Sequence, residues 1–154
     1  MNFDGVGDIV VTTITGASNF YCEFFVWQGN EYVFADHAGA EYGLCNYELY
    51  PEKGLVLSAQ NNGYAGALFE WHLFRWEGAA LKLVRSAVSN EYSTTEFMDS
   101  MITTVTDTQK IRVVIRDYTQ NRYEGDVLYD EAFALDGVTA ELFDEWNGIL
   151  LSGL

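Results

Sequence analysis

The chain has 154 residues, of which 49% are hydrophobic and 16% aromatic, so it is long enough to bury a core as one domain and extensive disorder is excluded. Eight basic residues stand against 23 acidic residues, which gives a net charge of −15. So acidic a chain repels phosphate backbones, which argues against a nucleic-acid partner. The charge is explained by a soluble surface, by cation binding or by a basic partner.

No apolar run reaches the roughly 18 residues of a transmembrane helix, and no signal peptide is recognisable in this chain. The two cysteines, Cys22 and Cys45, are too few for a disulfide scaffold and lack the spacing of a metal or redox motif. They fit either a single bridge or two buried thiols, and we favour the thiols.

The chain opens with a polar segment around Gly5, in which Asn2, Asp4 and Asp8 stand two and four residues apart. Oxygen-bearing side chains that alternate around a glycine are typical of calcium loops, where they turn inward onto the ion. In the pattern D-x-[DN]-x-D-G, the first aspartate would fall one residue before Met1. We therefore expect the sequence to begin inside this motif and to be a fragment of a longer chain.

Short runs rich in Val, Ile, Thr, Tyr, Phe and Trp follow, separated by glycine-containing turns, and this is typical of strands. The sequence predicts an all-β, mostly antiparallel domain. The predicted strands are 8–14, 20–27, 31–35, 44–49, 55–60, 68–76, 81–87, 101–106, 111–117 and 126–133.

The end of the chain differs from the rest. Thr139 is a suitable helix cap, and apolar side chains then recur at helical spacing on one face. These side chains are Leu142, Phe143, Trp146, Ile149 and Leu150. We expect a C-terminal helix over residues 139–151 that covers an open face or edge of the sheet.

Two hairpin segments resemble each other, one beginning at Trp27-Gln28-Gly29 and the other at Trp76-Glu77-Gly78, with a weaker echo at Tyr123-Glu124-Gly125. They are 49 and 47 residues apart, which is close to the roughly 40–50 residues of one propeller blade. The pattern predicts about three propeller-like hairpin units, 1–50, 51–98 and 99–135. Because a closed propeller has at least about four blades, we expect an open or partial arrangement.

With the loop and the hairpins in view, residues 2–85 resemble bacterial proteins that carry FG-GAP or VCBS repeats, the repeats of integrin α-chain propellers. The hallmark of this family is D-x-[DN]-x-D-G-x-x-D-[IL]-x-V. The matching residues here are Asn2, Asp4, Gly5, Asp8, Ile9 and Val11. The resemblance implies an exported, calcium-stabilised binding domain located outside the cell or in the cell envelope. Residues 90–154 carry no such resemblance.

Carried over residue by residue, the resemblance implies calcium ligation by side-chain oxygens of Asn2 and Asp4, by the Val6 carbonyl, and by Asp8 directly or through water. The first carboxylate ligand is missing, and Val11 stands where a bidentate glutamate would close the loop. Because calcium takes about six to eight oxygens, we expect a degenerate site. Calcium is the one candidate cofactor.

Catalytic candidates are weak. Glu70 and His72 alternate on one predicted strand and point to one face, where a carboxylate beside a histidine can tune a general base. A cross-strand polar contact is the simpler account. His37 is expected in a solvated turn. With 23 acidic residues, any carboxylate pair is unspecific, and no nucleophile or phosphate-binding motif occurs. We expect no enzymatic activity.

The aromatic surplus has two explanations. The run 20–27 is apolar on both faces, which indicates either packing on two sides or one face given to a partner. Tyr42, Tyr47, Tyr50 and Tyr64 fall at loops or strand ends, and we expect them to be exposed and to bind a protein or carbohydrate ligand.

Three functional hypotheses follow. The leading one is a non-enzymatic binding or scaffold module of the bacterial cell envelope, marked by one exposed aromatic patch. The second is an inhibitor or immunity-type protein that blocks a peptidoglycan-cleaving enzyme with a protruding acidic loop. The third is a carbohydrate or peptidoglycan hydrolase, marked by a cleft with two facing carboxylates.

Overall fold

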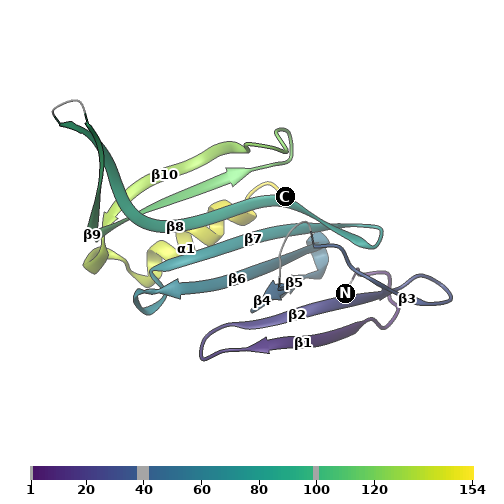
Figure 1. The fold of residues 1–154 in the computed structure, drawn as a ribbon. Helices are drawn as coiled ribbons and strands as arrows, with labels where there is room; N and C mark the ends of the chain where they lie inside the picture. The colour runs from purple at the N-terminus through teal and green to yellow at the C-terminus, as the bar shows by residue number, and fades with distance from the viewer. Residues whose placement is uncertain (1, 38–41, 99–100) are drawn as a thin grey trace.

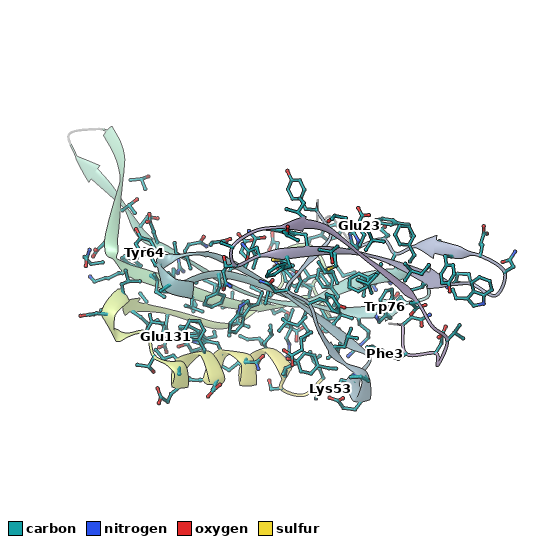
Figure 2. All side chains as sticks on the ribbon, turned by 90° about the horizontal axis from the view of Figure 1, so that it is seen from below. Phe3, Glu23, Lys53, Tyr64, Trp76 and Glu131 are labelled. Carbon is teal, nitrogen blue, oxygen red and sulfur yellow. The ribbon has the colours of Figure 1, made fainter. Side chains whose placement is uncertain are left out.

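The computed structural model describes residues 2–37, 42–98 and 101–154, and for residues 94–98, 101–103, 105 and 108 it describes the backbone alone. Two antiparallel sheets and one helix form three layers, with the larger sheet in the middle (Figures 1 and 2). The prediction of a mostly antiparallel β fold with a C-terminal helix is confirmed. No helix in the described ranges is long and apolar enough to cross a membrane.

The smaller sheet, here called the N-terminal sheet, contains β1 (Ile9–Thr15), β2 (Phe20–Trp27), β3 (Tyr32–Phe34) and β4 (Leu44–Cys45). Its order is β1-β2-β3, and β4 also pairs with β2. Burial alternates along β2 with the period of two that a strand imposes, so every second side chain is in the core.

The large sheet is an antiparallel meander in which each strand pairs with the next along the chain. Its strands are β5 (Glu48–Tyr50), β6 (Leu55–Gly63), β7 (Leu68–Glu77), β8 (Ala80–Met98), β9 (Met101–Asp117) and β10 (Asp126–Ala134). Short 3-10 turns occupy Pro51–Lys53, Tyr64–Gly66 and Leu135–Gly137, and α1 spans Ala140–Leu151.

Strand boundaries differ from the prediction in two places. The predicted strands 101–106 and 111–117 form the single strand β9, and β8 continues far beyond residue 87 to pair with it. The polar residues around 108–110 are absorbed by a shift in register, where Glu91 pairs with Ile111 but Tyr92 pairs with Asp107. The resulting long hairpin projects beyond the sheet (Figure 1).

The predicted strand 44–49 is divided between the two sheets as β4 and β5. The break is at Asn46, whose φ of 41° leaves the extended region. Its side chain ties the sheets together: Oδ1 accepts the Phe20 backbone N–H at 2.9 Å, and Nδ2 donates to the Ala59 carbonyl at 3.0 Å. A polar residue thus replaces strand pairing at the point where the chain changes sheets.

Both Trp-x-Gly segments are hairpin turns, between β2 and β3 and between β7 and β8. They belong to different sheets, however, and the regions 51–98 and 99–135 lie in one continuous sheet. No closed barrel or propeller forms within the ranges that the structure describes. A propeller-like relation among the hairpins remains a prediction.

The large sheet has a core on each face because successive side chains point to opposite sides. Thus Leu55 and Leu57 pack beneath the helix, whereas Val56 packs against the N-terminal sheet. From the helix, Trp146 and Leu150 are fully buried, and Leu142, Phe143 and Ile149 pack around them. This confirms the predicted apolar face, and the helix covers a sheet face rather than an edge.

The helix is anchored at its C-terminus by a buried cation. Arg85 on β8 bonds Asp117 on β9 at 2.9 Å and donates to the carbonyls of Ile149 and Ser152 at 3.0 and 2.6 Å. The last carbonyls of a helix lack intrahelical partners, and a cation there also complements the helix dipole. Arg85 therefore fixes the helix on the sheet.

Candidate binding surface

The outer side of the N-terminal sheet carries a continuous set of aromatic and aliphatic side chains. Because Val10, Cys22 and Phe24 point into the core between the sheets, their strand neighbours point outward. We call this surface the aromatic face. It consists of Ile9, Val11, Tyr21, Glu23, Phe25, Trp27, Tyr32, Phe34 and Tyr42.

Ring contacts organise the aromatic face. Phe25 meets Phe34 edge to face with centroids 5.6 Å apart, and Trp27 meets Tyr32 in the same manner at 5.0 Å. These are cross-strand neighbours in the β2–β3 register. These contacts order the rings but leave them accessible to solvent. The exposed members of the face, which are Ile9, Val11, Tyr32, Phe34 and Tyr42, have between 42% and 53% of their surface exposed.

No described element covers the aromatic face, because the large sheet and the helix both lie on the other side of the N-terminal sheet (Figures 1 and 2). Glu23 lies in the middle of the face, opposite Val11, and Figure 2 shows it on the side turned away from the helix. Within the described ranges Glu23 forms no ion pair.

Tyr42 joins this face through a constrained backbone. Gly43 has a φ of +90°, and a Cβ there would lie 2.4 Å from the Cys22 carbonyl oxygen, so only glycine fits. The Thr13 hydroxyl donates to the Tyr42 carbonyl at 3.3 Å, and the Tyr21 and Tyr42 rings are 6.1 Å apart. The expectation that Tyr42 is exposed is confirmed.

The other three tyrosines do not join the aromatic face. Tyr64 is exposed, but its hydroxyl donates to Glu91 at 2.9 Å, and this bond raises the pKa of Tyr64. Tyr47 packs on Phe24 in the core between the sheets, with centroids 4.9 Å apart. Tyr50 packs on the helix-side core. The expected exposure of Tyr47 and Tyr50 is therefore wrong.

Tyr50 illustrates why these two side chains turn inward. Burial, and then the Glu48 carboxylate, raises the pKa of Tyr50 to about 12. The sequence places Tyr47 and Tyr50 beside turns. Tyr47 directly precedes the short strand β5 and Tyr50 is its last residue, and this strand lies between the two cores, where an aromatic ring fills space.

One edge of the N-terminal sheet is β1, every residue of which is β-branched and none of which is charged. Native sheets usually protect such an edge with charges or proline, because unpaired backbone groups otherwise accept another strand. On the large sheet the edge strand β10 carries Asp126, Asp130 and Glu131. The contrast marks β1 as an unprotected edge beside the aromatic face.

The N-terminal loop forms the tight turn that its sequence predicts, with Gly5 at a φ of +84°. Its oxygens bond the chain itself: Asp4 accepts the Val6 backbone N–H at 2.8 Å, and Asp8 accepts the backbone N–H groups of Trp27 and Asn2 at 3.0 and 3.2 Å. In the described part of the chain no group of three His, Cys, Asp or Glu side chains is placed to hold a metal ion.

Glu70 and His72 share a face of β7, as their spacing predicts, and the register places Ser58 and Ser86 on either side of His72. Burial lowers the pKa of His72, although the Glu70 carboxylate opposes the shift. The imidazole is thus neutral near neutral pH. His37, expected in a solvated turn, is buried and contacts the Phe34 ring at 5.0 Å.

Both cysteines are buried free thiols. In the β2–β4 register Cys22 lies opposite Leu44 and Cys45 lies opposite Tyr21, so the two side chains point to opposite faces of the sheet. Burial raises the pKa of the Cys45 thiol, which keeps it protonated and unreactive.

No family model matches the chain, and no significant similarity was found among curated proteins or solved structures.

Proposed function

We propose that this chain is a non-enzymatic binding module, and that the aromatic face of the N-terminal sheet binds a basic segment of a partner protein. The observation that carries the proposal is an exposed, ordered array of rings around Glu23, which forms no ion pair within the described ranges. Large exposed apolar patches on a folded chain are typical of interaction sites, and aromatic residues are favoured at such sites.

Charge supports a basic partner. The first basic residue of the chain is Lys53, so the N-terminal sheet contains no lysine or arginine. The acidic residues that precede Lys53 are Asp4, Asp8, Glu23, Glu31, Asp36, Glu41, Glu48 and Glu52. A lysine or arginine of the partner can form an ion pair with the Glu23 carboxylate and cation–π contacts with the surrounding rings. Long-range electrostatic attraction would also increase the rate of association.

The β1 edge supports an extended segment as the form of the partner. A strand added beside β1 would satisfy the free backbone groups of that edge, and its alternate side chains would extend the aromatic face. Blocking a basic, peptidoglycan-cleaving enzyme is one form that this binding takes under the inhibitor hypothesis. A location in the bacterial cell envelope belongs to the proposal through the family resemblance alone.

Synthetic peptides of matched length test the proposal, in a basic series with lysine or arginine alternating with apolar residues and an acidic series with glutamate instead. We expect the basic peptides to shift the NMR signals of β1–β3, and Phe34→Ser or Glu23→Gln to weaken binding about tenfold. Val127→Ser is the matched control, because Val127 is equally exposed on β10 at the far edge of the large sheet.

Equal binding of the acidic and basic series would contradict the proposal, as would unchanged affinity in Phe34→Ser. Peptidoglycan fragments provide the alternative arm. If these bind the aromatic face and Glu23→Gln leaves their affinity unchanged, the face is a sugar-stacking platform and the basic-partner proposal is wrong.

A further inference from the structure

A second candidate site lies on the large sheet, and it is basic where the aromatic face is acidic. A pocket of about 430 Å³ opens where the β7–β8 turn approaches the β9–β10 loop. Its lining residues are Arg75, Glu77, Lys82, Leu83, Val84, Tyr118, Thr119 and Arg122. Three of the eight basic residues of the chain thus surround one pocket, against the single carboxylate of Glu77.

Two of these cations face each other directly. Arg75 on β7 pairs with Lys82 on β8, so both side chains leave the sheet on the same side. Like charges in this position destabilise a sheet unless an anion lies between them. Lys82 pairs with Glu77, whereas the side chains of Arg75 and Arg122 form no hydrogen bond or ion pair with any residue that the structure describes.

We infer that this pocket binds a dianionic phosphate group. Arg75 and Arg122 supply two uncompensated positive charges, and guanidinium forks match phosphate oxygens in geometry. Tyr118 and Thr119 line the same pocket, and the aromatic ring of Tyr118 can pack against an organic body attached to the phosphate.

The net charge of −15 does not prevent this binding. At physiological ionic strength the screening length is about 8 Å, so an anion in the pocket responds mainly to the cations that line it. The acidic N-terminal sheet packs over β5 to β8 through the core between the sheets and has no residue in the pocket lining. The phosphate site and the aromatic face are therefore independent.

Titration calorimetry and thermal unfolding with inorganic phosphate and with phenyl phosphate, each at constant ionic strength against chloride, test the inference. We expect both anions to bind and to raise the midpoint of unfolding by mass action. Tighter binding of phenyl phosphate identifies an organic phosphoester as the ligand class, and equal binding identifies free phosphate. A midpoint that rises no more with either anion than with chloride would overturn the inference.

Three variants separate a site from general charge effects. Arg75→Gln and Arg122→Gln should each weaken phosphate binding at least tenfold, and Lys110→Gln, which removes a cation paired with Asp107 outside the pocket, should not. Without phosphate, Arg75→Gln should unfold at the same or a higher temperature than the parent chain, because it relieves the like-charge pair. Unchanged affinity in both pocket variants would contradict the site.

Discussion

The N-terminal sheet and the large sheet consist of similar strands, yet they differ in how their faces are covered. The large sheet has the helix on one face and the N-terminal sheet on part of the other. The N-terminal sheet has one covered face, and its other face shows rings to solvent in the described structure. Aromatic side chains therefore fill cores in the large sheet, whereas in the N-terminal sheet they form both a core around Phe24 and an exposed surface.

The two sheets also differ in charge. All lysine and arginine residues follow residue 52, and four of them pair with carboxylates that the structure describes: Lys82, Arg85, Lys110 and Arg112. The N-terminal sheet has acidic residues without a cation and an edge strand without any charge. The large sheet is thus covered and has a charged edge, whereas the N-terminal sheet has an uncharged edge and an uncovered face, which are features that partners bind.

The same substitution of a tryptophan in the helix-side core and of one on the aromatic face gives the largest expected difference. Trp146→Ala removes a fully buried ring that lies 5.2 to 5.6 Å from those of Phe69, Phe133 and Phe143, and it should lower the free energy of unfolding by about 3–5 kcal/mol. Trp27→Ala on the aromatic face should lower it by less than about 1 kcal/mol. Urea denaturation measures both.

A cost for Trp27→Ala equal to that for Trp146→Ala would break the comparison, because it would mean that the aromatic face is covered in solution. Repeating the unfolding at several protein concentrations separates self-association from folding. Only self-association makes the midpoint depend on concentration.

The next largest effect on stability compares a buried arginine with an exposed arginine of the large sheet. Arg85→Met leaves Asp117 and the helix C-terminus without their cation and should cost about 3 kcal/mol, because breaking a buried ion pair is expensive. Arg112→Met is the control. That arginine pairs with Asp130 at the surface, with 53% of its side chain exposed, and its loss should cost about 0–1 kcal/mol.

The dependence of stability on acid pH tests the same Arg85–Asp117 ion pair. Burial acts to raise the pKa of Asp117, but hydrogen bonds from Thr119 and Arg85 outweigh it and hold that pKa below its ordinary value of 3.8. The stabilisation is thus complete above pH 3.8 and is lost as the pH falls through the lowered pKa. Arg85→Met should show a weaker loss of stability in that range. An identical acid dependence in both proteins would contradict the role given to the pair.

The sequence predicted those parts of the fold that depend on local pattern. The helical spacing around Trp146 located α1, and the Trp-x-Gly turns located two hairpins. The doubly apolar run 20–27 indicated either a buried strand or a partner face. Each of these signals lies within one element, where periodicity and turn chemistry act over a few residues.

The remainder depends on contacts between distant residues. Nothing around Arg85 indicates that it meets the carbonyl of Ser152, and nothing in the run 44–49 indicates that Asn46 breaks it to join two sheets. The phosphate pocket likewise needs the register that brings Arg75 opposite Lys82 and the loop that adds Arg122. Such groupings arise from sheet order, which a single sequence specifies weakly.

The smallest expected effect is that of calcium on the N-terminal loop, which precedes the uncovered sheet. The family resemblance proposes ligands at Asn2, Asp4, Val6 and Asp8, with the first carboxylate missing, so binding should be weak. At the roughly millimolar affinity of extracellular modules, 5 mM calcium stabilises the fold by about 1 kcal/mol and raises the unfolding midpoint by about 2–4 °C.

The substitution Asp4→Asn separates the effect of calcium binding from the effect of the turn's own hydrogen bonds. The amide keeps an oxygen that accepts the Val6 backbone N–H, now 2.8 Å from the carboxylate, and loses only the exposed bond from the Asn2 amide to the second oxygen. Stability without calcium should therefore change by less than about 0.5 kcal/mol. The loss of a charged ligand should abolish the calcium response. Asp136→Asn, an exposed acid in the turn before the helix, should retain the response. If calcium shifts neither the parent chain nor either variant, the loop is a polar turn in which the Asp8 carboxylate accepts the backbone N–H groups of Asn2 and Trp27.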